Sequence, residues 1–129
     1  MISSVSQIVR PSNGGCATMN TVGLFQEKQH AIFPGVFAQI FSGKELMMMR
    51  VTLGKGAVAP AHSHRHEQMS VILKGKVSFT IGEETRELAA GDVVSIPGHA
   101  VHTVTALEDA ELIEVFTPIR EDFVERFGL

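Results

Sequence analysis

Short apolar segments alternate with turn residues along most of the chain, from about residue 35 to residue 117. Segments of this length, separated by closely spaced Gly, Asp and Pro, are typical of an antiparallel β-sandwich or barrel. The expected strands cover residues 35–41, 45–53, 57–62, 68–74, 76–82, 85–89, 92–96, 100–105 and 110–117. Only the tail, Arg120-Glu121-Asp122-Phe123 onward, has a pattern that predicts a helical turn. The pattern therefore predicts an all-β fold.

The first thirty residues lack this periodicity. They are rich in Ser and include Pro11, Asn13, Gly14 and Gly15, a composition that predicts a loosely structured arm over residues 1–30. The remaining residues, 31–129, are expected to form a single domain. The arm could be disordered or could pair with a partner subunit, and the sequence does not decide between these alternatives.

Composition narrows the class of protein. The chain has 129 residues, 44% hydrophobic and 19% charged, which suits one globular domain. A net charge of -3 argues against nucleic acid as a partner. A single cysteine, Cys16, fits a reducing compartment. Neither a secretory signal nor an apolar run long enough to span a bilayer is present, so we expect a cytoplasmic protein with no membrane partner.

Three histidines are candidates for a metal site. His62 and His64 are two residues apart, so on a strand their side chains would point the same way. His102 lies between small apolar residues of another expected strand and could supply a further imidazole, which binds transition metals well. The alternatives are an exposed polar loop for the pair and an ordinary core histidine for His102. Spacing alone leaves both open.

Two charged residues near the end of the chain are candidates for catalysis. Glu114 shares a strand face with Leu112 and Phe116, and a carboxyl buried there would have a raised pKa suited to proton transfer. If that strand lies at a sheet edge, Glu114 is simply hydrated. Arg120 could clamp a substrate carboxylate or form a surface ion pair with the acids that follow it. Arg50 could line a pocket or face solvent.

Two stretches of the chain resemble the two cupin motifs. The first consists of Gly56, His62-Ser63-His64, Gln68 and Gly75, and the second of Gly91, Pro97 and His102. The resemblance implies a single cupin domain, a double-stranded β-helix or jelly-roll barrel, with one divalent metal (Zn, Ni, Fe, Mn or Cu) in its mouth. The ligands that it implies are His62, His64, Gln68 and His102. A homodimer is also expected, both from the family and because the strand around Met69–Leu73 is apolar on both faces.

The chain departs from the motifs at three places that matter, one of which is Ala106, where the second motif often closes with Asn. Gln68 stands where the family usually has Glu, which leaves the site one negative charge short. Pro97-Gly98 is expected to form a type II turn with Gly98 at its third position, which would place His99 at the rim and away from the metal. His66 has the same parity as His62, but it lies where the chain is expected to turn, and Gln68 is preferred to it as a ligand.

The closing segment is similar to that of the pectin degradation protein subgroup of small cupins. The similar residues are His64 to Gln68, Ile81 to Thr85 and Glu114 to Phe123. The resemblance implies ring opening of 4,5-unsaturated uronates to a linear keto acid. It also implies that Glu114 and Arg120 are catalytic and that Phe116 and Arg120 bind a carboxylate-bearing substrate. The subgroup has Asp where this chain has Glu114. A cupin dioxygenase and a non-enzymatic metal-containing sensor are the alternative functions.

Overall fold

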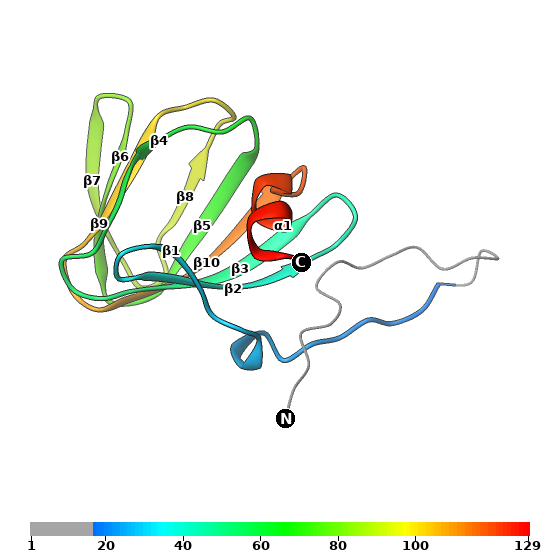
Figure 1. Ribbon diagram of the computed structural model, residues 1–129. Coiled ribbons are helices and arrows are strands. Elements are labelled where there is room, and N and C mark those ends of the chain that lie inside the picture. The colour runs from blue at the N-terminus through cyan, green and yellow to red at the C-terminus, as the bar shows by residue number, and fades with distance from the viewer. Residues whose placement is uncertain (1–16) are drawn as a thin grey trace.

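Two antiparallel sheets make up most of the protein in the computed structural model, which describes residues 17–129 (Figure 1). The strands of the six-stranded sheet, in spatial order, are β1 (His30–Phe33), β2 (Val36–Ser42), β3 (Met47–Leu53), β10 (Ala110–Thr117), β5 (Glu67–Lys74) and β8 (Val93–Ile96). Those of the four-stranded sheet are β4 (Val58–His62), β9 (His102–Ala106), β6 (Lys76–Ile81) and β7 (Glu84–Ala89). The all-β prediction is confirmed.

The expected strands match β2 to β10 closely, and the expected helix is α1 (Glu121–Phe127). Two elements were not expected from the sequence. One is β1, which pairs with β2 across the turn at Pro34-Gly35, and the other is the 3-10 turn η1 (Leu24–Gln26). Both are short, and neither has enough residues to show a period.

The core lies between the sheets because alternate side chains of each strand point inward. The largest fully buried side chains of the six-stranded sheet include Ile40, Met49, Ile72, Leu112 and Phe116. Burial of each such side chain contributes about 1.5–3 kcal/mol. Strand β10 lies between β3 and β5, so its inward face is at the centre of the sheet. Glu114 therefore does not lie on an edge strand, and that alternative is wrong.

Helix α1 packs across the end of β1. Arg126 donates hydrogen bonds to the carbonyl oxygens of Ala31 and Ile32 at 3.3 and 3.0 Å. The Phe127 ring stacks on His30, with ring centroids 4.6 Å apart. Phe123, on the same helix, is buried in the core. These contacts place the start of α1, including Arg120, beside the interior of the barrel.

Residues just before β1 contact the outer face of the six-stranded sheet. The Gln39 amide donates to the carbonyl oxygens of Phe25 and Glu27, each at 2.9 Å. The Arg50 guanidinium lies 4.1 Å from the centre of the Phe25 ring. Arg50 is thus on the outer face. Residues 1–16 of the expected arm lie outside the described residues, and its boundary at residue 30 stays a prediction. Within the described part of the chain, no helix is long and apolar enough to cross a membrane.

Candidate metal centre

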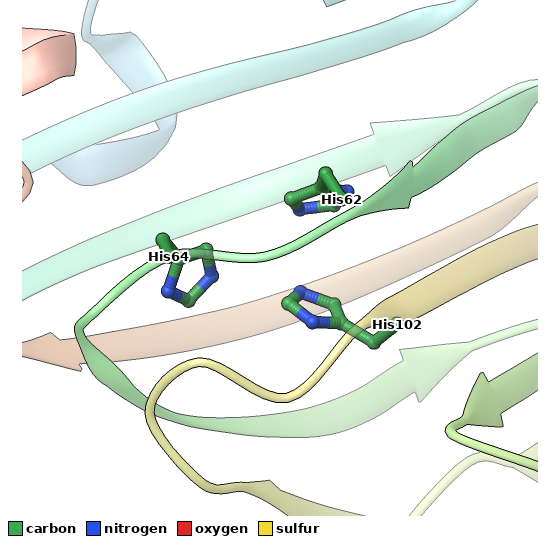
Figure 2. A group of neighbouring side chains, drawn as sticks. All are labelled: His62, His64 and His102. Atoms are coloured by element: carbon green, nitrogen blue, oxygen red, sulfur yellow. The ribbon is translucent and has the colours of Figure 1, made fainter.

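Three imidazoles meet at one end of the barrel (Figure 2). His62 ends β4, His102 begins β9, and the two residues are paired across the sheet. His64 lies in the loop that follows β4, and a nitrogen from each ring lies within 4.8 Å of the others. The expectation that His62 and His64 converge through strand alternation is therefore wrong. The strand ends at His62, and the loop places His64 against the other two rings.

Nδ1 of each of the three rings faces a backbone carbonyl oxygen. Nδ1 of His62, His64 and His102 lies 2.7, 3.1 and 2.8 Å from the carbonyl oxygens of Pro60, His66 and Ala100, respectively. A carbonyl oxygen only accepts, so a neutral ring that donates to it carries its hydrogen on Nδ1 and keeps a lone pair on Nε2. Nε2 of His102 is buried and has no hydrogen-bond partner. This is the arrangement that a metal-binding histidine needs, because the second nitrogen is anchored and the first is free to coordinate.

The surroundings keep two of these rings, those of His64 and His102, uncharged. Burial, together with the nearby Arg120 and His102, lowers the pKa of His64 to about 4. Burial also lowers the pKa of His102, where a hydrogen bond to the Ala100 carbonyl opposes the shift. An imidazolium has no lone pair to offer a cation, whereas a neutral imidazole does. At neutral pH both rings are therefore ready to coordinate.

Gln68 approaches the three rings from β5. Its side chain is buried, and its Oε1 lies 3.1 Å from Nε2 of His64. With Nδ1 of His64 protonated, both of these atoms carry lone pairs and neither carries a hydrogen. Two acceptors at this distance are stabilised by a cation that both can coordinate. Three imidazole nitrogens and an amide oxygen fit a divalent transition metal, without selecting one.

A cavity of about 300 Å³ joins the histidines to the closing segment of the chain. His62, Gln68 and His102 line one side of it, and Glu114 and Arg120 line another. Apolar side chains of the sheets close the remainder: Val36, Met49, Val51, Leu53, Val104 and Leu112. The structure thus brings the candidate metal ligands and the candidate catalytic residues into one space.

Glu114 is the carboxylate of this cavity. Burial raises the pKa of its carboxyl, against the opposing effect of the Ser70 hydrogen bond and the Arg120 charge. Ser70 Oγ donates to Glu114 Oε2 at 2.9 Å. Phe116, two residues further along β10, is also buried, and its ring centroid lies 5.7 Å from that of His64. A raised pKa makes a carboxyl a stronger base and keeps it protonated to higher pH, which favours a role in proton transfer.

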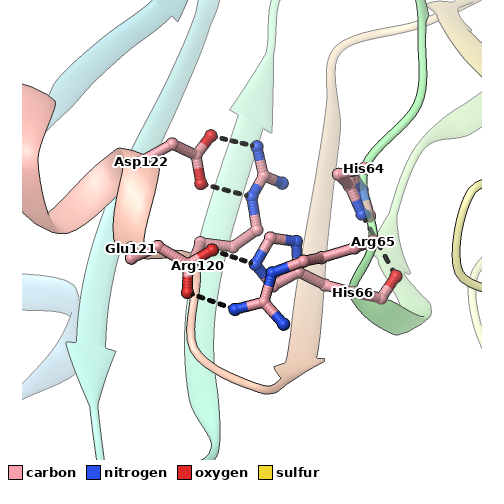
Figure 3. Close-up of polar contacts among 6 residues, drawn as sticks. All are labelled: His64, Arg65, His66, Arg120, Glu121 and Asp122. Carbon is pink, nitrogen blue, oxygen red and sulfur yellow. Dashed lines mark hydrogen bonds and ion pairs between the residues drawn. The ribbon is translucent and has the colours of Figure 1, made fainter.

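Arg120 is buried beside the same cavity rather than on the surface. Its Nε and Nη2 donate to Oδ1 and Oδ2 of Asp122 at 3.0 and 2.8 Å, as Figure 3 shows. The guanidinium also lies over the rings of Phe123 and Phe116, at 3.9 and 5.1 Å. The ion pair with Asp122 therefore forms, but with Arg120 buried rather than at the surface, and the carboxylate clamp stays a prediction. The Nη1 side is the one available to a substrate.

His66 links the loop between β4 and β5, which carries His64, to α1 (Figure 3). Its buried ring places Nε2 2.9 Å from Oε1 of Glu121, and Arg65 donates to the other oxygen of Glu121 at 2.7 Å. His66 is absent from the cluster formed by His62, His64 and His102. The sequence assigned no role to His66. Glu121 could have indicated an acidic partner for His66, but nothing in the local sequence indicated that these two residues lie close together.

The turn between β8 and β9 also contacts the loop between β4 and β5. His99 N donates to the His64 carbonyl at 2.6 Å, and a Cβ on Gly98 would lie 2.5 Å from the Arg65 carbonyl oxygen. The hydrogen bond from Ala100 N to the Pro97 carbonyl shows that Gly98 and His99 are the central residues of the turn. His99, not Gly98, has the positive φ, of 70°. The expected type II turn with Gly98 at its third position is therefore wrong by one residue.

Known proteins similar to this chain have the same architecture. The pectin degradation protein KdgF of Dickeya dadantii (strain 3937) is 35% identical over 82 residues, 62% of this chain and 74% of that protein. The structure of KdgF from Halomonas sp. is 30% identical, with a TM-score of 0.72, covering 77% of this chain and 94% of that one.

A second solved structure is similar to this chain in both sequence and fold. An RmlC-like cupin from Shewanella frigidimarina NCIMB 400 is also 30% identical, with a TM-score of 0.77, covering 83% of this chain and 97% of that one. The family model described as "Cupin domain" matches residues 49–116, which include all three clustered histidines. With its two sheets, its histidine centre and these relatives, the chain belongs to the cupin domain family, in which it is similar to the pectin degradation protein KdgF.

Proposed function

We propose that this protein is a metal-dependent cupin that opens the ring of a 4,5-unsaturated uronate and yields the linear keto acid. The observation that carries the proposal is the shared cavity, in which His62, His102 and Gln68 lie across from Glu114 and Arg120, with His64 clustered against the other two histidines. The similarity to a pectin degradation protein supports a sugar acid as the substrate class. The cavity volume, about 300 Å³, suits a small molecule rather than a polymer.

The reaction is an isomerisation in which no atom is gained or lost. The anomeric hydroxyl loses its proton, the bond from the anomeric carbon to the ring oxygen breaks, and an aldehyde and an enolate result. The enolate becomes a ketone when its carbon receives that proton. A bound divalent metal would supply Lewis acidity to a substrate oxygen. The protein must supply a group that moves the proton and a group that holds the carboxylate.

Glu114 is placed to move the proton. It faces the cavity, burial raises the pKa of its carboxyl, and Ser70 holds one of its oxygens. A carboxyl with such a pKa can take the hydroxyl proton and return it to carbon. Its side chain is one methylene longer than Asp, and the Ser70 hydrogen bond limits the positions that the longer chain can take.

Arg120 is placed to hold the substrate carboxylate. Asp122 accepts from Nε and Nη2, which fixes the guanidinium plane and leaves Nη1 outside this ion pair in a side chain that lines the cavity. Phe116 and Phe123 pack on the guanidinium faces. A guanidinium held on both faces and one edge loses little conformational entropy when it binds an anion.

The test is a ring-opening assay on a 4,5-unsaturated monouronate with purified protein. The conjugated alkene of the substrate absorbs in the ultraviolet, and its loss reports the reaction. We expect turnover in protein loaded with a divalent metal, loss of turnover after chelation and recovery when metal is returned. If metal-loaded protein leaves the substrate unchanged, the proposed function is wrong.

A further inference from the structure

One buried hydroxyl lies between the candidate ligand Gln68 and the candidate acid Glu114. Ser70 follows Gln68 by two residues on β5, so both side chains point inward, and Ser70 is only 1% exposed. It lies directly opposite Glu114 in the register of β5 and β10. Gln68 Nε2 donates to Ser70 Oγ at 3.0 Å, and Ser70 Oγ donates to Glu114 Oε2 at 2.9 Å.

The hydrogens of this chain of contacts can be counted. A serine hydroxyl has one hydrogen, and Ser70 Oγ donates it to Glu114 Oε2. The hydrogen of Ser70 is therefore committed to Glu114, and Ser70 Oγ can only accept from Gln68. The Gln68 amide must then turn its NH₂ group toward Ser70. Its carbonyl oxygen, Oε1, is left facing Nε2 of His64 at 3.1 Å.

We propose that Ser70 is a positioning residue that sets the orientation of the Gln68 amide, so that oxygen rather than nitrogen faces the three imidazoles. An amide of reversed orientation would present N–H groups to the imidazole lone pairs, and an N–H group cannot coordinate a cation. The side-chain amide of glutamine has an oxygen and an NH₂ group. A glutamine ligand therefore needs a neighbouring group that selects which of the two faces the metal. The inference rests on the metal site of the proposed function.

The first test compares two variants that each remove one buried hydroxyl. Ser70→Ala removes the proposed positioning group. Ser42→Ala is the matched control, because Ser42 is equally buried on β2 and bonds only the carbonyl of its neighbour Gly43. Metal-free protein is titrated with Zn²⁺ in a calorimeter. We expect about 10–100-fold weaker binding for Ser70→Ala, the usual effect of losing a group that orients a ligand. Ser42→Ala should bind within about twofold of the unaltered protein.

The second test separates orientation from a general loss of packing. In a Gln68→Glu background the ligand is a carboxylate, whose two oxygens are equivalent and leave no orientation to select. Ser70→Ala should then change Zn²⁺ affinity by less than about threefold. Equal losses with Gln68 unaltered and in the Gln68→Glu background would overturn the proposal. Ser70→Thr keeps the hydroxyl and is expected to keep the affinity; a loss as large as that of Ser70→Ala would also overturn it.

The outcomes distinguish this inference from the proposed function. If the unaltered protein binds Zn²⁺ and Ser70→Ala binds as tightly as Ser42→Ala, the role of Ser70 is wrong and the metal site stands. If the unaltered protein binds no divalent transition metal, both proposals fail. A loss confined to Ser70→Ala in the Gln68 background supports both. Thermal melts of each variant show that the comparison is made between folded proteins.

Discussion

At the scale of single residues, the ability of the candidate metal centre to bind a cation depends on which nitrogen of each imidazole carries the hydrogen. Three carbonyl oxygens, each two residues away in the chain from its histidine, hold the hydrogen on Nδ1. Burial then keeps His64 and His102 neutral at physiological pH. These two rings are therefore already oriented and already neutral, so a metal that binds them need not displace a proton from either.

Glu114 and Glu111 offer a comparison between two acids of the same strand. They lie on opposite faces of β10, with Glu114 lining the cavity and Glu111 paired with Arg50 outside it. Glu114→Gln removes the group proposed to move the proton, and we expect kcat to fall by about 10²–10⁴. Glu111→Gln makes the same chemical change away from the cavity and should leave kcat within about twofold. Steady-state kinetics on the unsaturated uronate measures both, and equal rates in the two variants would exclude the role of Glu114.

At the scale of secondary-structure elements, β10 organises both faces of the six-stranded sheet. Its inner face presents Glu114 and Phe116 to the cavity. On its outer face, Glu111 accepts from Arg50 at 2.9 Å, and Arg50 donates to Gln39 at 2.8 Å. Gln39 in turn holds the carbonyls of the segment around η1. One strand therefore supports the site on one side and anchors the N-terminal segment on the other.

The ion pair on the outer face predicts a dependence of stability on pH. The Arg50 hydrogen bond lowers the pKa of Glu111 below its ordinary value of 4.5. A depressed pKa means that the pair stabilises the folded state above about pH 4.5 and that this contribution is lost as the pH falls through the folded-state pKa. Glu111→Gln should cost about 0.5–1 kcal/mol at neutral pH, because the pair is partly exposed to solvent.

Denaturant unfolding at several pH values measures this difference. We expect the unaltered protein and Glu111→Gln to differ at neutral pH and to converge in acid. A difference that stays constant as the pH falls well below 4.5 would mean that the ion pair is not its source.

At the scale of the whole molecule, the outer face of the six-stranded sheet carries an apolar patch beside the Arg50–Glu111 ion pair. Its exposed large side chains, each 39–62% exposed, are Phe37, Met48, Met69, Leu73 and Val93. Met48 and Met69 flank Val115 in one row across three strands. An apolar face of this kind on a small protein is typical of an interaction surface. The homodimer expected from the sequence stays a prediction, and this face is where we place its contact.

Sedimentation velocity tests the predicted dimer. Met69→Glu puts a charge at the middle of the apolar face and should shift the protein to a monomer, since an unpaired charge in an interface is costly. Val58→Glu is the control, because Val58 is 41% exposed and lies on β4 of the other sheet. It should leave the oligomeric state unchanged. A monomeric unaltered protein would contradict the prediction.

The sequence by itself determined the class of fold and the two stretches that supply the site. Alternation of apolar residues and the turn residues between strands are local properties, so they located nine strands and α1 without knowledge of the partners. Motif spacing identified His62, His64 and His102, which the structure brings together. The apolar strand face around Glu114 and the resemblance of the closing segment selected Glu114 and Arg120, which line the same cavity.

Only the tertiary structure decided how these residues are held. The loop that places His64, the link from His66 to Glu121, the outward position of Arg50 and the contact of Ser70 with Glu114 all join residues far apart in the chain. Such pairs depend on which strands are neighbours and on their register, and neither is a property of a single segment. Local pattern therefore predicts which residues can form the site, whereas strand order and register determine their partners.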